Sequence, residues 1–318
     1  MNGIEQTLKS LYNNDKKYGE LSSLYKLFDK NLGKAIVSHL QDQLNLRESE
    51  RSFERIYIDF QWIDKIPLAS FVNPQKDLNG NLIDSKTELG DLFIQYRHNN
   101  VWKNKSDNIG TLQYCHRSLV IQSKLASEDN PIVPIGVIRK NKINSTSKEL
   151  KLLEEWPEFD LYETSKSNNS LAKNLKVLES ENPFAFFGGF TNSSQKWSFG
   201  VAKNGTVCDE TFSQVISNLA NGKAGKDISK DKAWKTISSA ITKTCNNRNI
   251  PKSVAGKIES RNKTSDIHTS VTYTFPGQLI YWIELLYEKF IYIIRAKKML
   301  VITIDRISYE GDDISRYR

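Results

Sequence analysis

The chain is poor in cysteine and shows no long apolar run that is free of charge. Its three cysteines, Cys115, Cys208 and Cys245, lie far apart and form no Cys-x-x-Cys pair. An odd number without a regular spacing indicates reduced thiols rather than a disulfide framework. The longest apolar stretch, residues 278–294, is interrupted by charged residues, and residues 1–16 contain no apolar signal core. We therefore expect a cytoplasmic protein without a membrane span.

Several catalytic and cofactor motifs are also missing. The four histidines show no zinc-ligand spacing, and the chain contains neither a Gly-x-Ser-x-Gly elbow nor a dinucleotide-binding glycine fingerprint. Residues 222–226 contain two glycines and two lysines, but their spacing does not fit a phosphate-binding loop. Zinc chemistry, serine-hydrolase chemistry and nicotinamide chemistry therefore lack support in the sequence.

The charge balance is compatible with a nucleic-acid partner without requiring one. The 318 residues include 45 Lys and Arg against 37 Asp and Glu, which gives a formal net charge of +8. Contacts to phosphates need such cations, but the acidic residues are also numerous, so charge alone does not decide the partner. The length fits one large domain or two smaller ones, with enough residues for a substantial core.

Hydrophobic spacing divides the chain into three regions. Residues 1–50 are expected to form helices, residues 51–203 an α/β core, and residues 204–318 a mainly helical C-terminal region. Within the core, residues 56–63, 68–72, 91–96, 119–125, 184–190 and 197–201 are expected as strands. Thr146 as N-cap and Glu149 three residues on fit a capping box, which predicts a helix that ends at Trp156. A further helix is expected over residues 170–178. In the last region, residues 278–296 are expected to form a helix that is apolar nearly all round, followed by a strand over 299–304.

Two short apolar segments, both expected as strands, contain the best candidates for catalytic residues. Asp91 opens one of them, and Gln122 and Lys124 lie on the other, where alternation turns both to the same face. If the two strands are neighbours, a carboxylate, an amide oxygen and an ammonium group meet at one place. Such a set of groups suits a Mg²⁺ (or Mn²⁺) site for phosphodiester cleavage.

This pattern resembles the PD-(D/E)xK nuclease superfamily, which has an Asp on one strand and (Glu or Gln)-x-Lys on a later one. Asp91, Gln122 and Lys124 match these positions, with Glu88 as an additional acid, and the likeness covers about residues 56–125. The resemblance implies a restriction-endonuclease-like mixed sheet flanked by helices. It also implies Mg²⁺ bound by Asp91, Gln122 and Glu88, with Lys124 acting on the attacking water or the charged phosphorane. Small nuclease-like proteins of bacterial phage-defence loci are similar, which implies a defence setting and a partner protein.

Basic and aromatic residues near these strands are candidates for contacts with nucleic acid, most simply double-stranded DNA. A loop between the strands is expected to carry Trp102, Lys103 and Lys105 beside the site, and Arg97 and Arg117 flank the strands. An exposed loop without a ligand is the alternative for these residues.

Each site residue also has a structural alternative. Asp91 could cap a turn, Gln122 could be a core amide, and Lys124 could be a solubilising lysine at a sheet edge. The neutral Gln122 and the apolar helix at 278–296, a candidate dimer or partner surface, support a second function. That function is a catalytically inactive subunit that binds nucleic acid or protein.

Overall fold

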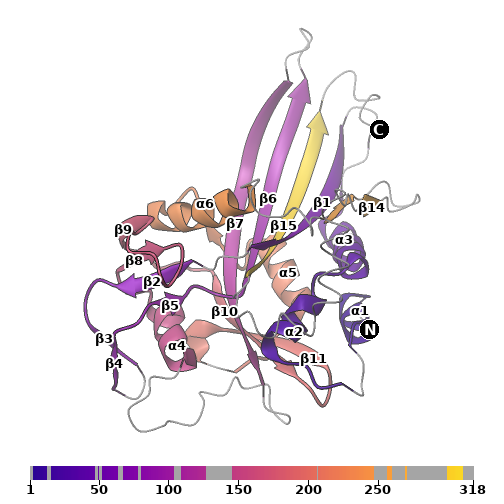
Figure 1. The fold of residues 1–318 in the computed structure, drawn as a ribbon. Helices are drawn as coiled ribbons and strands as arrows, with labels where there is room; N and C mark the ends of the chain where they lie inside the picture. The colour runs from indigo at the N-terminus through magenta and orange to yellow at the C-terminus, as the bar shows by residue number, and fades with distance from the viewer. Residues whose placement is uncertain are drawn as a thin grey trace.

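The computed structural model describes residues 3–12, 16–46, 49, 52–63, 67–77, 80–103, 109–126, 145–205, 207–246, 256–259, 269–270 and 299–310. It has an α/β fold in which a mixed sheet is flanked by helices (Figure 1). Among the helices that the structure describes, none combines the length and hydrophobicity needed to cross a bilayer. The expected helix at 278–296 lies outside the described residues.

Three helices precede the sheet, as expected: α1 (Gly3–Ser10), α2 (Glu20–Lys26) and α3 (Lys30–Leu44). The Asp29 side chain caps α3 by accepting hydrogen bonds from the backbone N–H groups of Asn31 and Leu32, at 2.7 and 3.1 Å. The helix ends at Asn45, which adopts the left-handed conformation with φ of 44°. The apolar face of α3 is fully buried, which fixes this helical layer against the rest of the core.

The main sheet has nine strands in the order β11-β10-β7-β6-β15-β1-β13-β14, with β12 paired to β7. Its strands are β1 (Ser52–Ile63), β6 (Leu92–Lys103), β7 (Ile109–Leu125), β10 (Ala185–Thr191), β11 (Lys196–Val201), β12 (Lys226–Asp227), β13 (Gly256–Glu259), β14 (Thr269–Ser270) and β15 (Met299–Glu310). β6 runs parallel to β15, β7 runs parallel to β10, and the other neighbouring pairs are antiparallel.

The position of β15 changes the expected organisation of the chain. This strand lies between β1 and β6 and pairs with β1 along its whole length and with β6 from Leu300 to Glu310. The expected boundary at residue 203 therefore does not separate the sheet from a helical C-terminal region, because residues 299–310 belong to the centre of the sheet. The strand predicted over 299–304 is confirmed and continues to Glu310.

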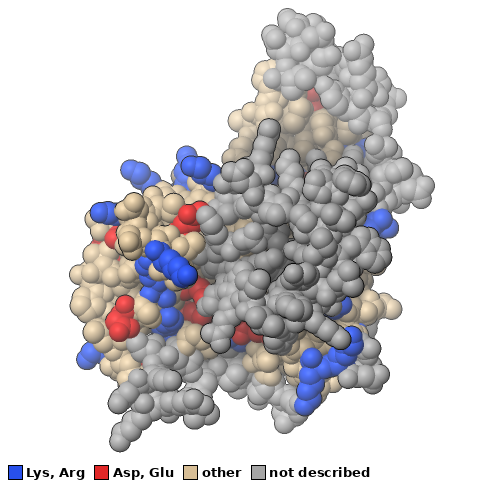
Figure 2. Space-filling model, in the orientation of Figure 1, with Lys and Arg blue, Asp and Glu red and all other residues tan. Residues whose placement is uncertain are grey.

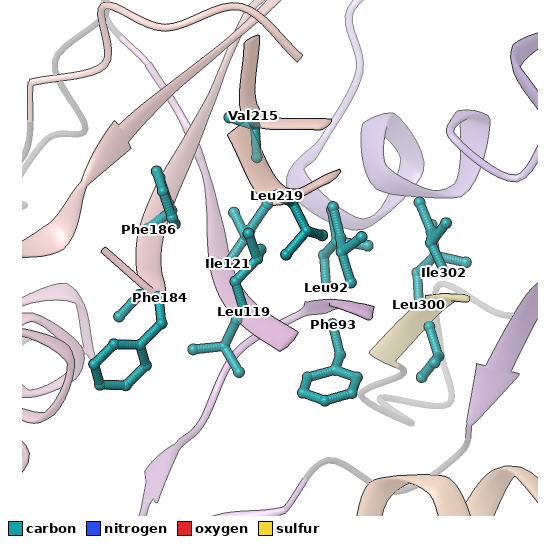
Figure 3. Close-up of a cluster of buried hydrophobic side chains, with 14 of the residues drawn as sticks. Leu92, Phe93, Leu119, Ile121, Phe184, Phe186, Val215, Leu219, Leu300 and Ile302 are labelled. Atoms are coloured by element: carbon teal, nitrogen blue, oxygen red, sulfur yellow. The ribbon is translucent and has the colours of Figure 1, made fainter. Parts of the chain in front are cut away.

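The inner half of the sheet is apolar on both faces, as expected for strands covered on two sides. Val215 and Leu219 of α5 (Phe212–Ala220) lie over Ile121 and Leu92, and Phe93 points to the opposite face (Figure 3). All five side chains are nearly or fully buried. The rest of the covering structure comprises α4 (Ser145–Glu155), α6 (Lys232–Asn246) and the short helix η1 (Ala202–Asn204).

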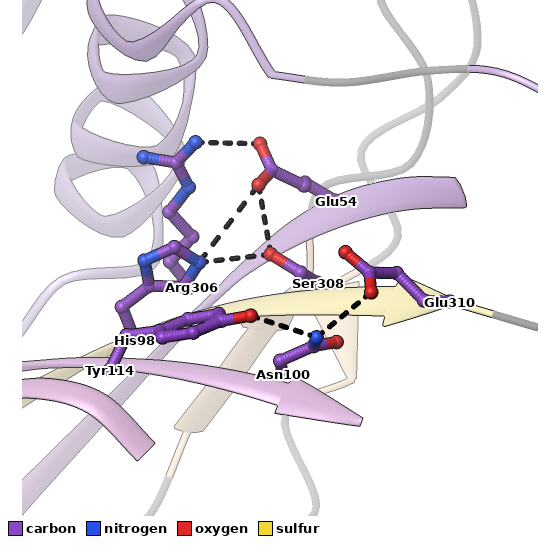
Figure 4. A network of polar contacts seen from close by, with 7 residues as sticks. All are labelled: Glu54, His98, Asn100, Tyr114, Arg306, Ser308 and Glu310. Atoms are coloured by element: carbon purple, nitrogen blue, oxygen red, sulfur yellow. Dashed lines mark hydrogen bonds and ion pairs between the residues drawn. The ribbon is translucent and has the colours of Figure 1, made fainter. Parts of the chain in front are cut away.

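The outer half of the same strands forms a long arm, defined here as residues 52–57, 97–103, 109–116 and 305–310 (Figure 1). On one face, buried Glu54 pairs with Arg306 at 2.6 Å and accepts a hydrogen bond from Ser308 at 2.8 Å (Figure 4). His98 bonds to the Ser308 hydroxyl at 2.9 Å. Paired charges and hydrogen bonds thus connect β1, β6 and β15 on this face of the arm.

A second sheet of four strands lies beside the first, in the order β5-β2-β8-β9. It contains β2 (Leu68–Phe71), β5 (Thr87–Glu88), β8 (Phe159–Tyr162) and β9 (Ala172–Leu175), and the small pair β3 (Gln75–Lys76) and β4 (Leu82–Ile83) is separate. The helix predicted over 170–178 is wrong, because residues 172–175 form β9. β8 pairs with both β2 and β9. The pairing of β9 with β8 overrides the helical spacing of the apolar residues in 170–178.

Candidate functional site

Asp91 lies directly before β6, between β7 and the start of β15. Its backbone N–H donates to the Ile121 carbonyl and its own carbonyl accepts from Leu300 N–H, both at 2.9 Å. The preceding Gly90 has a φ of +153°, and a Cβ there would lie 3.0 Å from the Ile121 carbonyl oxygen. Glycine therefore allows the close backbone approach that brings Asp91 against β7.

The structure brings Asp91 and Gln122 together, as their strand positions predict. Gln122 Nε2 donates to Asp91 Oδ2 at 2.5 Å, and the Ser123 N–H and Oγ donate to the same oxygen at 3.0 and 3.1 Å. Gln122 Oε1 is buried and has no hydrogen-bond partner among the described residues. One amide oxygen beside the Asp91 carboxylate thus remains available to an electron-pair acceptor.

Lys124 lies near this pair but binds two other acids. Its Nζ is 2.9 Å from Glu149 Oε2 on α4 and 3.5 Å from Glu20 Oε1 on α2. The Lys124 side chain is 11% exposed and that of Glu149 3%, whereas Glu20 is 36% exposed. The candidate site, comprising Asp91, Gln122, Lys124, Glu149 and Glu20, is therefore closed on the α4 side and reaches solvent on the α2 side.

Sequence reasoning missed both glutamates. Glu149 looked like the fourth residue of a capping box with Thr146, but α4 already begins at Ser145 and Glu149 is buried. A signal was present, since Glu149 shares the helix face of buried Leu152 and Leu153, where an ionised acid needs a cation. Glu20 gave no such signal, because acids are ordinary in the first turn of a helix.

The pKa values of Asp91 and Lys124 are both raised, but for different reasons. Burial raises the pKa of Asp91 to about 7; Lys124 opposes this change, and Glu20 and Glu149 add to it. Burial alone would lower the pKa of Lys124, but Glu149, Asp91 and Glu20 together raise it above its ordinary value. Lys124 is therefore a permanent cation, and Asp91 is the group that titrates near neutral pH.

The position of Glu88 does not support its predicted place in the site. It belongs to β5 in the four-stranded sheet, where it pairs with Leu68 of β2. The charged groups that shift the Asp91 pKa are Lys124, Glu20 and Glu149, and Glu88 is not among them. Its role as a metal ligand stays a prediction, and Glu149 and Glu20 are the acids next to Lys124.

Three of the residues expected to contact nucleic acid, Arg97, Trp102 and Lys103, lie along the arm rather than around the site. Trp102 and Lys103 are strand residues of β6, not loop residues, and Lys105 lies outside the described residues. Trp102 is ten positions from Leu92, which at ~3.3 Å per residue places it roughly 33 Å along the strand. The expected loop beside the site is thus wrong for this segment.

The two arginines have local partners in the sheet. Arg97 makes a two-point ion pair with Asp305 of β15, at 2.5 and 2.7 Å. Arg117 lies on β7 beside Cys115 and the Gly222 turn. On the face shown in Figure 2, the lysines and arginines of the described residues are scattered among acidic and uncharged ones. The net charge of the chain therefore does not gather into one basic surface on the described part of this face.

The donor set of the site fits a hydrated magnesium ion better than a metal held by many acids. No group of three or more His, Cys, Asp or Glu able to hold a metal occurs among the described residues. Mg²⁺ needs fewer protein ligands, because it keeps several waters and binds through one or two carboxylates plus substrate phosphates. Asp91 and the unpartnered oxygen of Gln122 could hold such an ion, whose phosphate ligands would come from the substrate.

Comparisons with known proteins give no match: neither a family model, nor a curated protein, nor a solved structure resembles the chain.

Proposed function

We propose that the chain is a Mg²⁺-dependent nuclease that cleaves phosphodiester bonds of DNA, with Asp91, Gln122 and Lys124 as the site. The contact of the Asp91 and Gln122 side chains, with the charged Lys124 beside them, carries this proposal. The mixed α/β sheet agrees with the restriction-endonuclease-like fold implied by the motif. The bacterial defence setting and a partner protein of such a system come from the motif's resemblance alone.

Each residue of the site has a separate role in the proposed cleavage reaction. Asp91 and Gln122 would hold Mg²⁺, which when bound polarises the phosphate and its attacking water. Lys124 is positioned to stabilise negative charge that develops on the phosphate oxygens, since its ammonium stays protonated. Glu149 orients that ammonium from the buried side through the 2.9 Å ion pair. The phosphate would approach from the side of α2, where Glu20 is the most exposed member of the site.

A plasmid-cleavage assay with Mg²⁺ or Mn²⁺ tests this function. We expect wild-type protein to nick or cut the plasmid, and a chelator to stop it. Asp91→Asn and Lys124→Met should each lower the rate by roughly a hundredfold or more, because a metal ligand and a charge-stabilising group are lost. Lys151→Met is the matched control, since this lysine lies on α4 and pairs with Glu155 outside the site. Normal cleavage by both site variants would refute the assignment.

A catalytically inactive subunit is the second candidate, and the ion pairs of Lys124 favour it. An ammonium group already neutralised by Glu149 and Glu20 has less charge to offer a phosphate, and Gln122 supplies none to a metal. This function predicts DNA binding that weakens with added salt, with no cleavage in any metal. The same assay with a binding measurement separates the two functions.

A further inference from the structure

Among the described residues, none pairs with the outer edge of β7 over residues 109–115 of the arm. β7 pairs with β10 over Val120–Leu125 and with β12 at Arg117 and Ser118, and Ile228 N–H donates to the His116 carbonyl at 3.0 Å. Along residues 109–115, β6 is the only described strand beside β7, and no described element flanks this edge in Figure 1. About every second residue of this segment therefore presents its backbone N–H and C=O outward.

This edge carries only one of the features that usually prevent strand pairing. Residues 109–115 read Ile-Gly-Thr-Leu-Gln-Tyr-Cys, with no charged residue and no proline. Natural edge strands commonly carry lysine, proline or a bulge to block contact with another strand. The one such feature here is the shift in register opposite His98 and Asn99, and the strand pairs regularly again beyond it. An open, uncharged edge of this length is a template for β-sheet extension.

Large exposed apolar side chains line the same edge. Leu112 and Tyr114 are 54% and 53% exposed, and Trp102 on the neighbouring strand is 43% exposed. They share one face: Leu112 pairs with Asn100, the Tyr114 hydroxyl accepts from Asn100 Nδ2 at 3.0 Å, and the Trp102 ring lies against Gly110. We call Trp102, Leu112 and Tyr114 the apolar stripe. It is the part of the arm that would gain most from being covered.

We propose that a second copy of this chain pairs with the open edge, β7 against β7, antiparallel about a twofold axis near Leu112 and Gln113. An antiparallel strand pair is self-complementary under twofold symmetry, so one surface serves both copies. The edge is uncharged, so two chains of net charge +8 meet without like charges at the seam. The two apolar stripes then meet across the seam and are covered together. This dimer is independent of the proposed nuclease function.

Sedimentation of the full-length chain tests the proposal. We expect wild-type protein to form a dimer whose proportion rises with concentration. Leu112→Lys should raise the dissociation constant of the dimer by about a hundredfold, because it places two ammonium groups at the seam. Leu171→Lys is the matched control, since Leu171 is 53% exposed on the loop before β9, away from the arm. The control should sediment as wild type.

Mixing oppositely charged variants separates edge pairing from misfolding. Leu112→Lys and Leu112→Glu should each be monomeric alone, and an equimolar mixture should recover the dimer, because the charges then attract across the seam. Wild-type protein that stays monomeric at high micromolar concentration would overturn the proposal. So would a Leu112→Lys dimer as tight as wild type. A monomer whose tryptophan fluorescence is quenched by DNA, with that quenching lost in Trp102→Phe, would instead assign the stripe to nucleic acid, which also overturns the proposal.

Discussion

At the residue scale, the site depends on one carboxyl group placed where water cannot solvate it. Asp91 accepts three hydrogen bonds on a single oxygen, yet burial still raises its pKa to about 7. The juxtaposition of Asp91 with Gln122 follows from strand alternation and could be predicted from the sequence. The ion pairs of Lys124 could not, because they come from α2 and α4, whose positions depend on packing rather than on local pattern.

The raised pKa of Asp91 predicts a specific dependence of stability on pH. Folding favours the protonated carboxyl, because its folded pKa of about 7 exceeds the ordinary value of 3.8. This contribution is complete below pH 4 and is lost as the pH rises to 7 and above, on the order of 4 kcal/mol. Asp91→Asn removes the titrating group, so its free energy of unfolding should fall less than that of wild type between pH 4 and pH 8. Urea unfolding at both pH values measures the difference, and parallel curves would contradict the burial argument.

The Lys124–Glu149 ion pair should be strongly coupled. Lys124→Met leaves a buried carboxylate and Glu149→Leu a largely buried ammonium, and each should cost about 3 kcal/mol of unfolding free energy. The double variant removes both charges and should recover most of that loss, because apolar side chains can fill the same space. A double-mutant cycle by urea denaturation measures the coupling. Additive losses would show that the two side chains do not depend on each other.

At the scale of elements, the apolar strands were predictable and the polar ones were not. The structure contains the strands expected over residues 56–63, 119–125, 184–190 and 197–201. Each of these segments is rich in apolar residues because it lies where the sheet is covered on both faces. Residues 97–103 read Arg-His-Asn-Asn-Val-Trp-Lys, which lacks that pattern, yet they extend β6 into the arm. Cross-strand pairs such as Arg97–Asp305 hold this extension, and a sequence window on one strand does not contain them.

Glu54 should be the most sensitive residue of the arm. It is buried on β1 and binds Arg306 and Ser308 of β15 (Figure 4). Glu54→Ala leaves Arg306 without this carboxylate, and we expect a loss of about 3 kcal/mol in unfolding free energy. Glu155→Ala is the comparison, because that glutamate is half exposed and its ion pair with Lys151 should contribute less than about 1 kcal/mol. Equal losses in the two variants, measured by urea unfolding, would argue against a network that stabilises the arm.

At the scale of the whole molecule, the last described strand completes the sheet. β15 separates β1 from β6, and its parallel partner β6 lies some two hundred residues earlier in the chain. Local sequence predicted a strand at residues 299–304 but contained nothing that placed it between those two strands. The expectation that this strand belongs to a mainly helical C-terminal region was therefore wrong. Its pairing with β1 and β6 joins segments that are distant in the sequence, so no local pattern could predict it.

Removal of β15 should abolish folding of the whole sheet rather than of a C-terminal part. A chain that ends at residue 298 loses every hydrogen bond that joins β1 to β6, so we expect no cooperative thermal transition. A chain that ends at residue 310 keeps all the described strands and is the control, with a transition expected near that of wild type. Calorimetry compares the two, and cooperative unfolding of the shorter chain would show that β15 is dispensable.

The most direct test of the proposed metal site is anomalous diffraction from crystals of the wild-type chain soaked in Mn²⁺. We expect one peak about 2.0–2.2 Å from an Asp91 carboxylate oxygen, with Gln122 Oε1 turned toward it. The same soak of Asp91→Asn crystals should remove that peak and leave any surface ions in place. A wild-type map without an ion beside Asp91, with the Gln122 amide still hydrogen-bonded to the carboxylate, would contradict the account.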